Sequence, residues 1–278
     1  MMGGGAVLSV AAVVMLVPAS RHHLLGTLRG EALQNGKYVS QWVDDLSNQD
    51  EDTRREAANN LGNLGTRGRS ALPELLRVTC EDPDEHVRCM AAFAVYKIAS
   101  AVKRYQDDRA TEILDALIVA LQDDDPIVRM NATLGLGTLG PDARKAVPQL
   151  EAGIKRKDND VRVLWFTMSV REQMILTLGF IGPDAKGALR LLEESLADKQ
   201  ESTRCMAATA LGKLGTDAKH AVPLLLKTAD NPSEHRVVRQ SARDAIALID
   251  PESAAKKPAS SPAVQKLSGG APSGRAEQ

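Results

Sequence analysis

The chain has 278 residues, of which 43% are hydrophobic, so it can bury a sizeable core. Its 35 basic and 36 acidic residues give a net charge of -1, which provides no charge excess for binding nucleic acid or an anionic membrane surface. Aromatic residues make up only 3% of the chain, so alanine and leucine must supply the packing, and three cysteines, an odd number, argue against a disulfide framework.

Residues 1–20 are predicted to be a signal peptide or an N-terminal hydrophobic anchor. A largely apolar run extends from Ala6 to Val17 and is followed by Pro18 and small residues that suit a cleavage site, although the preceding MMGGG carries no Lys or Arg. As a helix the run would span about 18 Å, too short for a hydrocarbon core of about 30 Å. We expect an exported protein, periplasmic or extracellular, or one anchored in the membrane by its N-terminus, with the cytoplasm as the alternative.

Residues 21–35 are expected to be a linker, and a repeat domain is expected to occupy residues 36–250. Its first helix begins near Val39 with an amphipathic pattern. Terminal repeats must cover an otherwise exposed core, so Tyr38 and Trp42 are predicted to cap the open end of the array.

Six copies of one helical pattern follow. Each copy starts with an Arg, has mostly Ala three residues later, and has an aliphatic residue seven and ten residues later. These offsets share one face of a helix and therefore predict a buried stripe. Four copies carry Gly eleven residues after the Arg, which is typical of the left-handed residue that ends a helix. The six residues that start the copies are Arg54, Arg88, Arg129, Arg171, Arg204 and Arg239.

Each copy is predicted to be the second helix of a pair. A recurrent phrase marks the first helix, as in Ala71-Leu72-Pro73 and Ala146-Val147-Pro148, and the Arg residues are spaced 33 to 42 residues apart, the period of helical solenoids. The predicted fold class is all-α: an α-solenoid, or superhelix, of about six helical hairpins. Such pairs bury a continuous core only when they stack.

The segments Asp84-Glu85-His86-Val87-Arg88 and Asp125-Pro126-Ile127-Val128-Arg129, with the columns that follow them, resemble HEAT repeats. The resemblance is strongest to the HEAT-like subgroup named after phycobilisome lyases, and it covers roughly residues 36–250. It implies that the Asp four residues before the Arg caps the second helix and helps to neutralise a ladder of Arg residues between repeats. Those aspartates are Asp50, Asp84, Asp125 and Asp158.

Two stretches depart from the period. Ser100–Thr111 is expected to lengthen the first helix of the third pair. In the fourth pair an Asp-x-x-Val-Arg segment ends at Arg162, nine residues before the Arg171 that starts the columns. Nine residues turn a helix by about 900°, which would place the two side chains on opposite faces. A break, a kink or a protruding turn is therefore expected at Val163–Val170.

That insertion carries Trp165 and Phe166, with Met168 beside them. Aromatic side chains are enriched at interfaces, and insertions in solenoids commonly lie on the binding face, so these three residues are candidates for partner binding. The alternative is that the insertion folds back and fills a groove between repeats.

The resemblance also implies that the second helices line the concave face. Residues one and five after the Arg point away from the buried stripe, and in the middle of the array they predict an apolar strip suited to an extended peptide or a partner helix. The alternative is that these side chains belong to the core. The candidate residues of this strip are Phe93, Met130, Leu134 and Leu176, together with Cys89 and Cys205.

Residues 251–278 are rich in Pro, Ser, Ala and Gly and are predicted to form a disordered tail. No catalytic residues, metal ligands or cofactors are predicted. Gly135–Gly140 matches G-x-G-x-x-G, but it closes a helix, whereas a dinucleotide site needs it between a strand and a helix. Deoxyhypusine hydroxylase, a HEAT-like enzyme, uses His-Glu pairs, whereas this chain has Glu85-His86 and Glu234-His235 in the reverse order.

The expected function is that of a non-enzymatic scaffold. It would bind a partner protein or peptide on the concave face, at the insertion of residues 163–170, or at both. The alternative is a chromophore lyase-like protein or another enzyme with a HEAT fold. Nucleic-acid binding is disfavoured by the neutral charge, and no membrane contact is expected beyond the possible N-terminal anchor.

Overall fold

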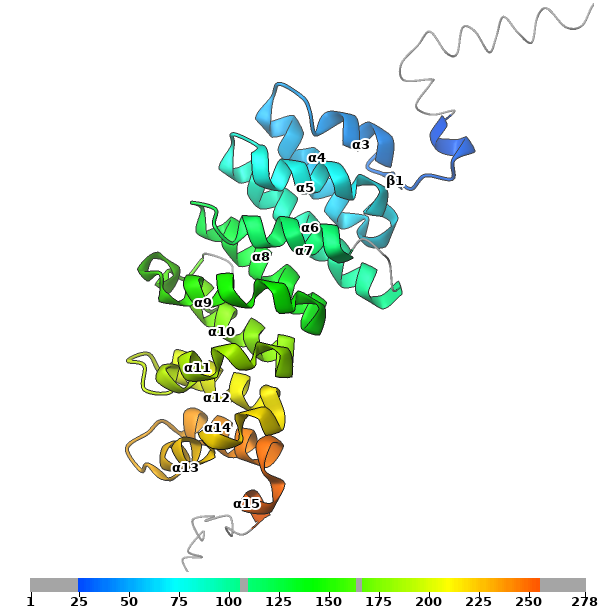
Figure 1. Ribbon diagram of the computed structural model, residues 1–278. Helices are drawn as coiled ribbons and strands as arrows, with labels where there is room; N and C mark the ends of the chain where they lie inside the picture. The colour runs from blue at the N-terminus through cyan, green and yellow to red at the C-terminus, as the bar shows by residue number, and fades with distance from the viewer. Residues whose placement is uncertain (1–24, 106–109, 164–166, 256–278) are drawn as a thin grey trace, which may run out of the picture.

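The computed structural model describes residues 25–105, 110–163 and 167–255, in which six helix pairs stack into an elongated array with α3 at one end and α14 at the other (Figure 1). The predicted all-α solenoid is thereby confirmed. The first helices are α3 (Val39–Asp45), α5 (Leu72–Glu81), α7 (Ala110–Ala120), α9 (Val147–Lys155), α11 (Leu189–Ser195) and α13 (Val222–Asp230). The second helices are α4 (Glu51–Asn63), α6 (Glu85–Tyr105), α8 (Pro126–Leu139), α10 (Val170–Ile181), α12 (Glu201–Leu214) and α14 (Arg236–Ile249).

Four of the second helices end at a glycine eleven residues after the repeat Arg. Gly65, Gly140, Gly182 and Gly215 have φ angles of 53°, 60°, 75° and 65°. The ψ angles of the last three lie between -128° and -143°, so they adopt a conformation that is essentially restricted to glycine, not the left-handed helical one. Each glycine opens a 3-10 segment that leads into the next first helix: η1 (Gly65–Ala71), η2 (Gly140–Ala146), η4 (Gly182–Ala188) and η5 (Gly215–Ala221).

The buried stripe forms a core that runs through all six pairs. The aliphatic residues seven after the Arg are buried, as are those ten after it, with exposures of at most 4%. Alanine at offset three lets the helices of a pair approach closely, and burying each aliphatic side chain contributes about 1.5–3 kcal/mol. The hydrophobic periodicity therefore accounts for the stacking of the pairs.

The second helices of successive repeats lie unusually close together. A Cβ atom placed on Gly62, Gly179 or Gly212 would lie only 2.8–2.9 Å from the Cα of an alanine in the next second helix. Second helices contact one another along the whole array, whereas several successive first helices meet mainly through the 3-10 segments beside them. The more closely spaced row lies on the inside of a curved stack, so the second helices form its inner face.

The extra segment was predicted to lengthen the first helix of the third pair, but its residues 100–105 continue the second helix of the second pair, since α6 runs to Tyr105. Residues 106–109 lie outside the described part of the chain, and α7 starts at Ala110. The reason is local: Ala99 occupies the position where four other copies have glycine, and alanine favours continuation of a helix.

A short β-hairpin covers the N-terminal end of the array. Its strands β1 (Leu33–Gln34) and β2 (Lys37–Tyr38) are joined by Asn35 and Gly36, both with positive φ, as a tight two-residue hairpin turn requires. Trp42 is 2% exposed, and its Nε1 donates a hydrogen bond to the Gln34 carbonyl at 3.0 Å. The hairpin and this indole close the end of the core, as expected for Trp42.

Both termini extend past the described residues. The predicted signal peptide or anchor of residues 1–20 lies outside them. At the other end, residues 251–255 of the predicted tail form the short helix α15 (Pro251–Ala255), held by Ser253, whose backbone N–H and hydroxyl donate to Asp250. The rest of the predicted tail, residues 256–278, is outside the described part of the chain. Of the helices in that part, none is long and apolar enough to cross a membrane.

Candidate functional site

The Arg at the start of each second helix connects its repeat to the following one. Arg54 donates from Nε and Nη2 to the two carboxylate oxygens of Asp82, at 2.8 and 2.9 Å, while its Nη1 binds backbone carbonyls in its own repeat. Arg88 holds Asp123 in the same way, at 2.8 and 3.1 Å. Planar two-point contacts of this kind are the strong form of an ion pair.

The ladder continues through the C-terminal half. Arg171 lies 2.7 Å from Asp198, and Arg204 forms a two-point contact with Glu234 at 2.8 and 2.7 Å. Hydrogen bonding to Arg204 lowers the pKa of Glu234 and raises that of Arg204. Arg239 ends the ladder, and its buried Nε has no hydrogen-bond partner among the described residues.

Of the four aspartates that the resemblance implied, Asp158 alone forms an ion pair with a ladder Arg within the described residues. Asp50, Asp84 and Asp125 cap the second helices by accepting hydrogen bonds from backbone N–H groups of the first turn. The ladder instead uses other acids, such as Asp82 and Asp123, which precede the capping aspartates by two residues. In the loops before α6 and α8, capping and neutralisation are therefore divided between two acids.

Arg129 is the most deeply buried member of the ladder, with a side chain 1% exposed. It donates to Asn159 at 2.7 Å and to Asp158 at 3.2 Å, and burial lowers its pKa. Asp158 was predicted to cap the next second helix, but it lies in the 3-10 segment η3 (Lys157–Asp160), and Ser169 caps α10 instead. The insertion separates Asp158 from the start of α10, which explains the difference.

The expected break in the fourth pair is present. Arg162 and Ser169 form an isolated antiparallel bridge, and α10 begins only at Val170. Trp165 and Phe166 lie outside the described residues, so their proposed binding role stays a prediction. Met168 is half-buried.

The predicted apolar residues of the inner face differ in how deeply they are buried. Met130 is fully buried and belongs to the core, which corrects its assignment to the surface. Phe93, Leu134 and Leu176 are half-buried on the inner face, where a ligand can reach them. Cys89 is 7% exposed, and burial raises the pKa of its thiol to about 12, so it stays protonated and is a poor nucleophile.

A cavity of about 430 Å³ opens on this face between α4, α6 and α8. Apolar side chains supply most of its wall. Asn131, which is 3% exposed, also lines it; the amide Nδ2 donates to the Cys89 carbonyl at 3.2 Å, and Oδ1 has no partner among the described residues. The full lining is Arg55, Asn59, His86, Cys89, Met90, Phe93, Ile127 and Asn131.

We define the inner strip as the residues five and nine after each ladder Arg. These two positions are about 40° apart on a helix and face away from the buried stripe. Every member is exposed or half-buried. The strip consists of Asn59, Phe93, Leu134, Leu176, Thr209 and Asp244, and of Asn63, Lys97, Thr138, Phe180, Lys213 and Leu248.

Two lysines of the inner strip lie over aromatic rings of the same strip. Lys97 Nζ is 5.3 Å from the centre of the Phe93 ring, and Lys213 Nζ is 4.6 Å from that of Phe180, which is 41% exposed. Neither lysine has a carboxylate within 4.0 Å among the described residues. Sequence reasoning missed Lys97, Phe180 and Lys213 because it considered only offsets one and five. Offset nine lies beside offset five on the helix and could have identified them.

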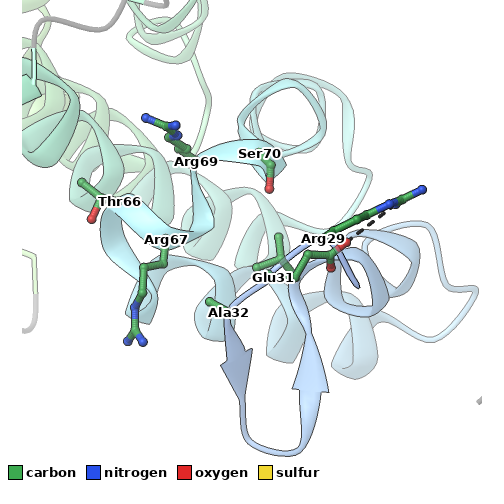
Figure 2. Close-up of a pocket in the computed structure, with 9 residues that line it drawn as sticks. Arg29, Glu31, Ala32, Thr66, Arg67, Arg69 and Ser70 are labelled. Carbon is green, nitrogen blue, oxygen red and sulfur yellow. Dashed lines mark ion pairs between the residues drawn. The ribbon is translucent and has the colours of Figure 1, made fainter. Parts of the chain in front are cut away.

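A second, larger cavity of about 860 Å³ lies between the N-terminal segment and η1. Figure 2 shows that the guanidinium groups of Arg29, Arg67 and Arg69 point in different directions, and Arg29 pairs with Glu31 at 3.7 Å. The three cations therefore do not converge on a common ligand. Within the described ranges, no three His, Cys, Asp or Glu side chains gather to hold a metal ion.

Comparison with known proteins identifies the repeats. Residues 39–107, 96–169 and 167–247 match a family model described as HEAT repeats. No curated protein matches the sequence.

Solved structures share the fold at low sequence identity. A designed armadillo repeat protein in complex with the peptide (KR)4 is similar with a TM-score of 0.62 and 18% identity, over 76% of this chain and 99% of that chain. The complex of CpcE and CpcF of phycocyanin lyase from Nostoc sp. PCC7120 is similar with a TM-score of 0.53 and 24% identity, over 78% and 80%. An engineered protein matches with a TM-score of 0.58 and 23% identity, over 77% and 98%.

Proposed function

Since the chain belongs to the HEAT-repeat family, we propose that it is a non-enzymatic scaffold that binds a partner protein or peptide along the row of second helices. The observation that carries this proposal is the apolar cavity of about 430 Å³ on the inner face, where Met90, Phe93 and Ile127 are accessible from solvent. Clefts of this size, with mostly apolar walls and a few polar groups, are typical of binding sites.

The cavity favours binding over catalysis. Its only thiol, Cys89, stays protonated, and its remaining polar groups are those of Arg55, Asn59, His86 and Asn131. A general base needs to lie within hydrogen-bonding reach of an activated nucleophile, and this wall offers no such pair. A half-buried aromatic ring beside aliphatic side chains instead provides an anchor point for one apolar side chain of a partner.

One such anchor supplies only part of a stable interface. Burying an apolar side chain of leucine size contributes about 1.5–3 kcal/mol, so a partner would also need contacts along the strip. Leu134, Leu176 and Phe180 extend the accessible apolar surface into the next two repeats. This continuity suits an extended segment or a helix, both of which present regularly spaced side chains.

The related folds are consistent with this proposal without identifying a partner. The designed armadillo protein was solved with a peptide, and CpcE and CpcF were solved as a complex with each other. The insertion at residues 163–170 is a second proposed contact, in which Trp165 and Phe166 would supplement the anchor at Phe93. Aromatic residues on an insertion beside the inner helices would enlarge the interface.

Affinity capture tests the proposal. The full chain, a Phe93→Asp variant and a Val119→Ala variant are immobilised and exposed to native extract. Val119 is a control because it is 57% exposed on the first helix α7, away from the inner face. Circular dichroism and the melting temperature establish that all three proteins are folded.

A partner that is retained by the parent and by Val119→Ala but lost from Phe93→Asp would support the proposal. Equal capture by all three would place the binding site away from this cavity, and a parallel Trp165→Ala/Phe166→Ala variant would then test the insertion. Capture of no specific partner by any protein would contradict the scaffold. The lyase-like alternative would then be tested by the change in absorbance of an added bilin.

A further inference from the structure

We infer that the segment recognised on the inner face is an acidic peptide with a large apolar side chain. The side chain enters the cavity at Phe93, and the carboxylates of the segment pair with Lys97 and Lys213. This inference rests on the proposed binding function and specifies its partner.

The first argument is the charge of the inner strip. Its charged members are Lys97, Lys213 and Asp244. Asp244 lies in the last repeat and already accepts a hydrogen bond from Gln240 at 2.8 Å. The four central repeats therefore present two cations on the strip and no carboxylate.

Three acids on the second helices are already engaged. Glu172 is fully buried, and its two oxygens accept hydrogen bonds from the backbone of Ser169 and the hydroxyl of Ser202. At the N-terminal end, Asp52 pairs with Arg55. Glu201 pairs with His235 at 2.6 Å when that imidazole is protonated. The strip itself has no carboxylate in the four central repeats, so Lys97 and Lys213 are its uncompensated charges there.

The second argument is the position of the two ammonium groups. Each is held over the face of an aromatic ring, whose negative electrostatic potential attracts the cation. The rings keep the cations on the inner face, where Lys97 also donates a long hydrogen bond to Asn63 Oδ1 at 3.4 Å. A bound carboxylate would supply charge-assisted hydrogen bonds that both ammonium groups lack within the described residues.

The third argument is the unpaired amide oxygen in the cavity. Asn131 Nδ2 donates to the Cys89 carbonyl, which orients the amide and leaves Oδ1 without a donor. A buried polar atom without a partner is destabilising, because it has lost its hydrogen bond to water. A backbone N–H of a peptide whose side chain fills the cavity would satisfy it, so the site suits an extended peptide better than a purely apolar small molecule.

The charge of the strip also discriminates between peptides. The designed armadillo protein of similar fold was solved with (KR)4, a basic peptide. Here Lys97 and Lys213 would repel a basic segment and attract an acidic one, so a common fold would serve opposite charge preferences.

Fluorescence anisotropy with labelled peptides tests the inference on the full chain. The first probe alternates glutamate with leucine, the second replaces each glutamate by lysine, and the third replaces each leucine by alanine. We expect the first probe to bind at least about tenfold more tightly than the other two, and to weaken as salt is added. Phe93→Ala should weaken its binding, whereas Val119→Ala should not.

A charge-reversed protein provides the decisive comparison. Lys97→Glu/Lys213→Glu should exchange the preference, so that the lysine–leucine probe binds more tightly than the glutamate–leucine probe. Both substituted side chains are surface members of the strip, and the melting temperature verifies that the variant is folded.

Any of four outcomes would overturn the inference. The lysine–leucine probe could bind the parent protein as tightly as the acidic one, or the charge reversal could leave the preference unchanged. A labelled peptide with the sequence of residues 6–17 could bind more tightly than the acidic probe, which would assign the cavity to the chain's own N-terminal segment. If neither charged probe binds while Phe93-dependent capture of a partner persists, the inference fails and the proposed function stands. If no partner is captured in a Phe93-dependent way either, the inference and the proposed function both fail.

Discussion

Arg204 holds Glu234 of the following repeat through two parallel contacts of 2.8 and 2.7 Å, with side chains only 18% and 10% exposed. Arg239 occupies the same position one repeat later, and its Nε has no partner in the described part of the chain. An Arg at this repeat position therefore forms a stabilising ion pair in one repeat and makes no such contact in the next.

Arg204→Ala should destabilise the protein by about 2–3 kcal/mol, because it leaves the largely buried Glu234 without its cation. Arg239→Ala, the matched control, should destabilise the protein less than Arg204→Ala, because it breaks no ion pair and removes a buried Nε that has no partner among the described residues. Urea unfolding followed by circular dichroism measures both values. Equal losses for the two variants would show that the ladder contact does not supply the difference.

Glu234 should also make the stability dependent on acid. Hydrogen bonding to Arg204 lowers its pKa in the folded protein, so the unfolded chain binds more protons than the folded one in this range. Its contribution is complete above the unfolded value of about 4.3 and is lost as the pH falls through the lower folded value. Unfolding experiments from neutral pH to below pH ~4 should show a shallower acid-induced loss for Glu234→Gln, from a lower starting stability. An unchanged slope would contradict this assignment.

Gly179→Ala should destabilise the array by about 1–3 kcal/mol, even though alanine is the better helix former. The new Cβ would lie 2.8 Å from the Cα of Ala210, and backbone atoms cannot move aside cheaply. Gly187→Ala is the control, because the nearest atom to its Cβ would be Glu151 Oε1 at 3.7 Å, an ordinary contact. Thermal unfolding of both variants checks the prediction, and a loss of stability in the control alone would refute it.

Gly215→Ala should cost about 1–3 kcal/mol for a different reason. No neighbouring atom lies within 4 Å of the Cβ position, so the added methyl group would not clash. The cost comes from the backbone, whose φ is +65° and whose ψ is -141°. An L-amino acid is strained in that conformation. The melting temperature of Gly215→Ala should therefore fall, and that of a Gly215→Asn variant should fall as well, because ψ lies outside the left-handed helical region that asparagine tolerates. An unchanged melting temperature for both variants would be the contrary result.

The period of the Arg and aliphatic columns was sufficient to predict the six helix pairs, because a residue repeated at offsets seven and ten marks one helical face wherever the chain folds into a helix. The glycines at offset eleven were equally informative, since few other residues can adopt positive φ. Such features depend on neighbours along the chain, which a single sequence displays directly.

The features that could not be predicted depend on contacts between repeats. Asp82 and Asp123 stand two residues before the capping aspartates, and nothing within a single repeat indicates which of the two acids meets the preceding Arg. The burial of Met130 depends on how closely α8 approaches its neighbours. The extension of α6, by contrast, has a local signal, because Ala99 stands where four other copies have glycine and alanine favours continuation of a helix.

The direction of the ladder has a consequence for how the array opens. Each Arg from Arg54 to Arg204 reaches forward to the next repeat, and the N-terminal end is covered by the hairpin over Trp42, whereas Arg239 has no following repeat to hold within the described residues. Neighbouring repeats stabilise one another, so an unsupported end opens at lower free energy than the middle. Thermal fraying should therefore begin at α13 and α14 and travel towards the N-terminus, with amide protons in these two helices exchanging before those of α4 and α6.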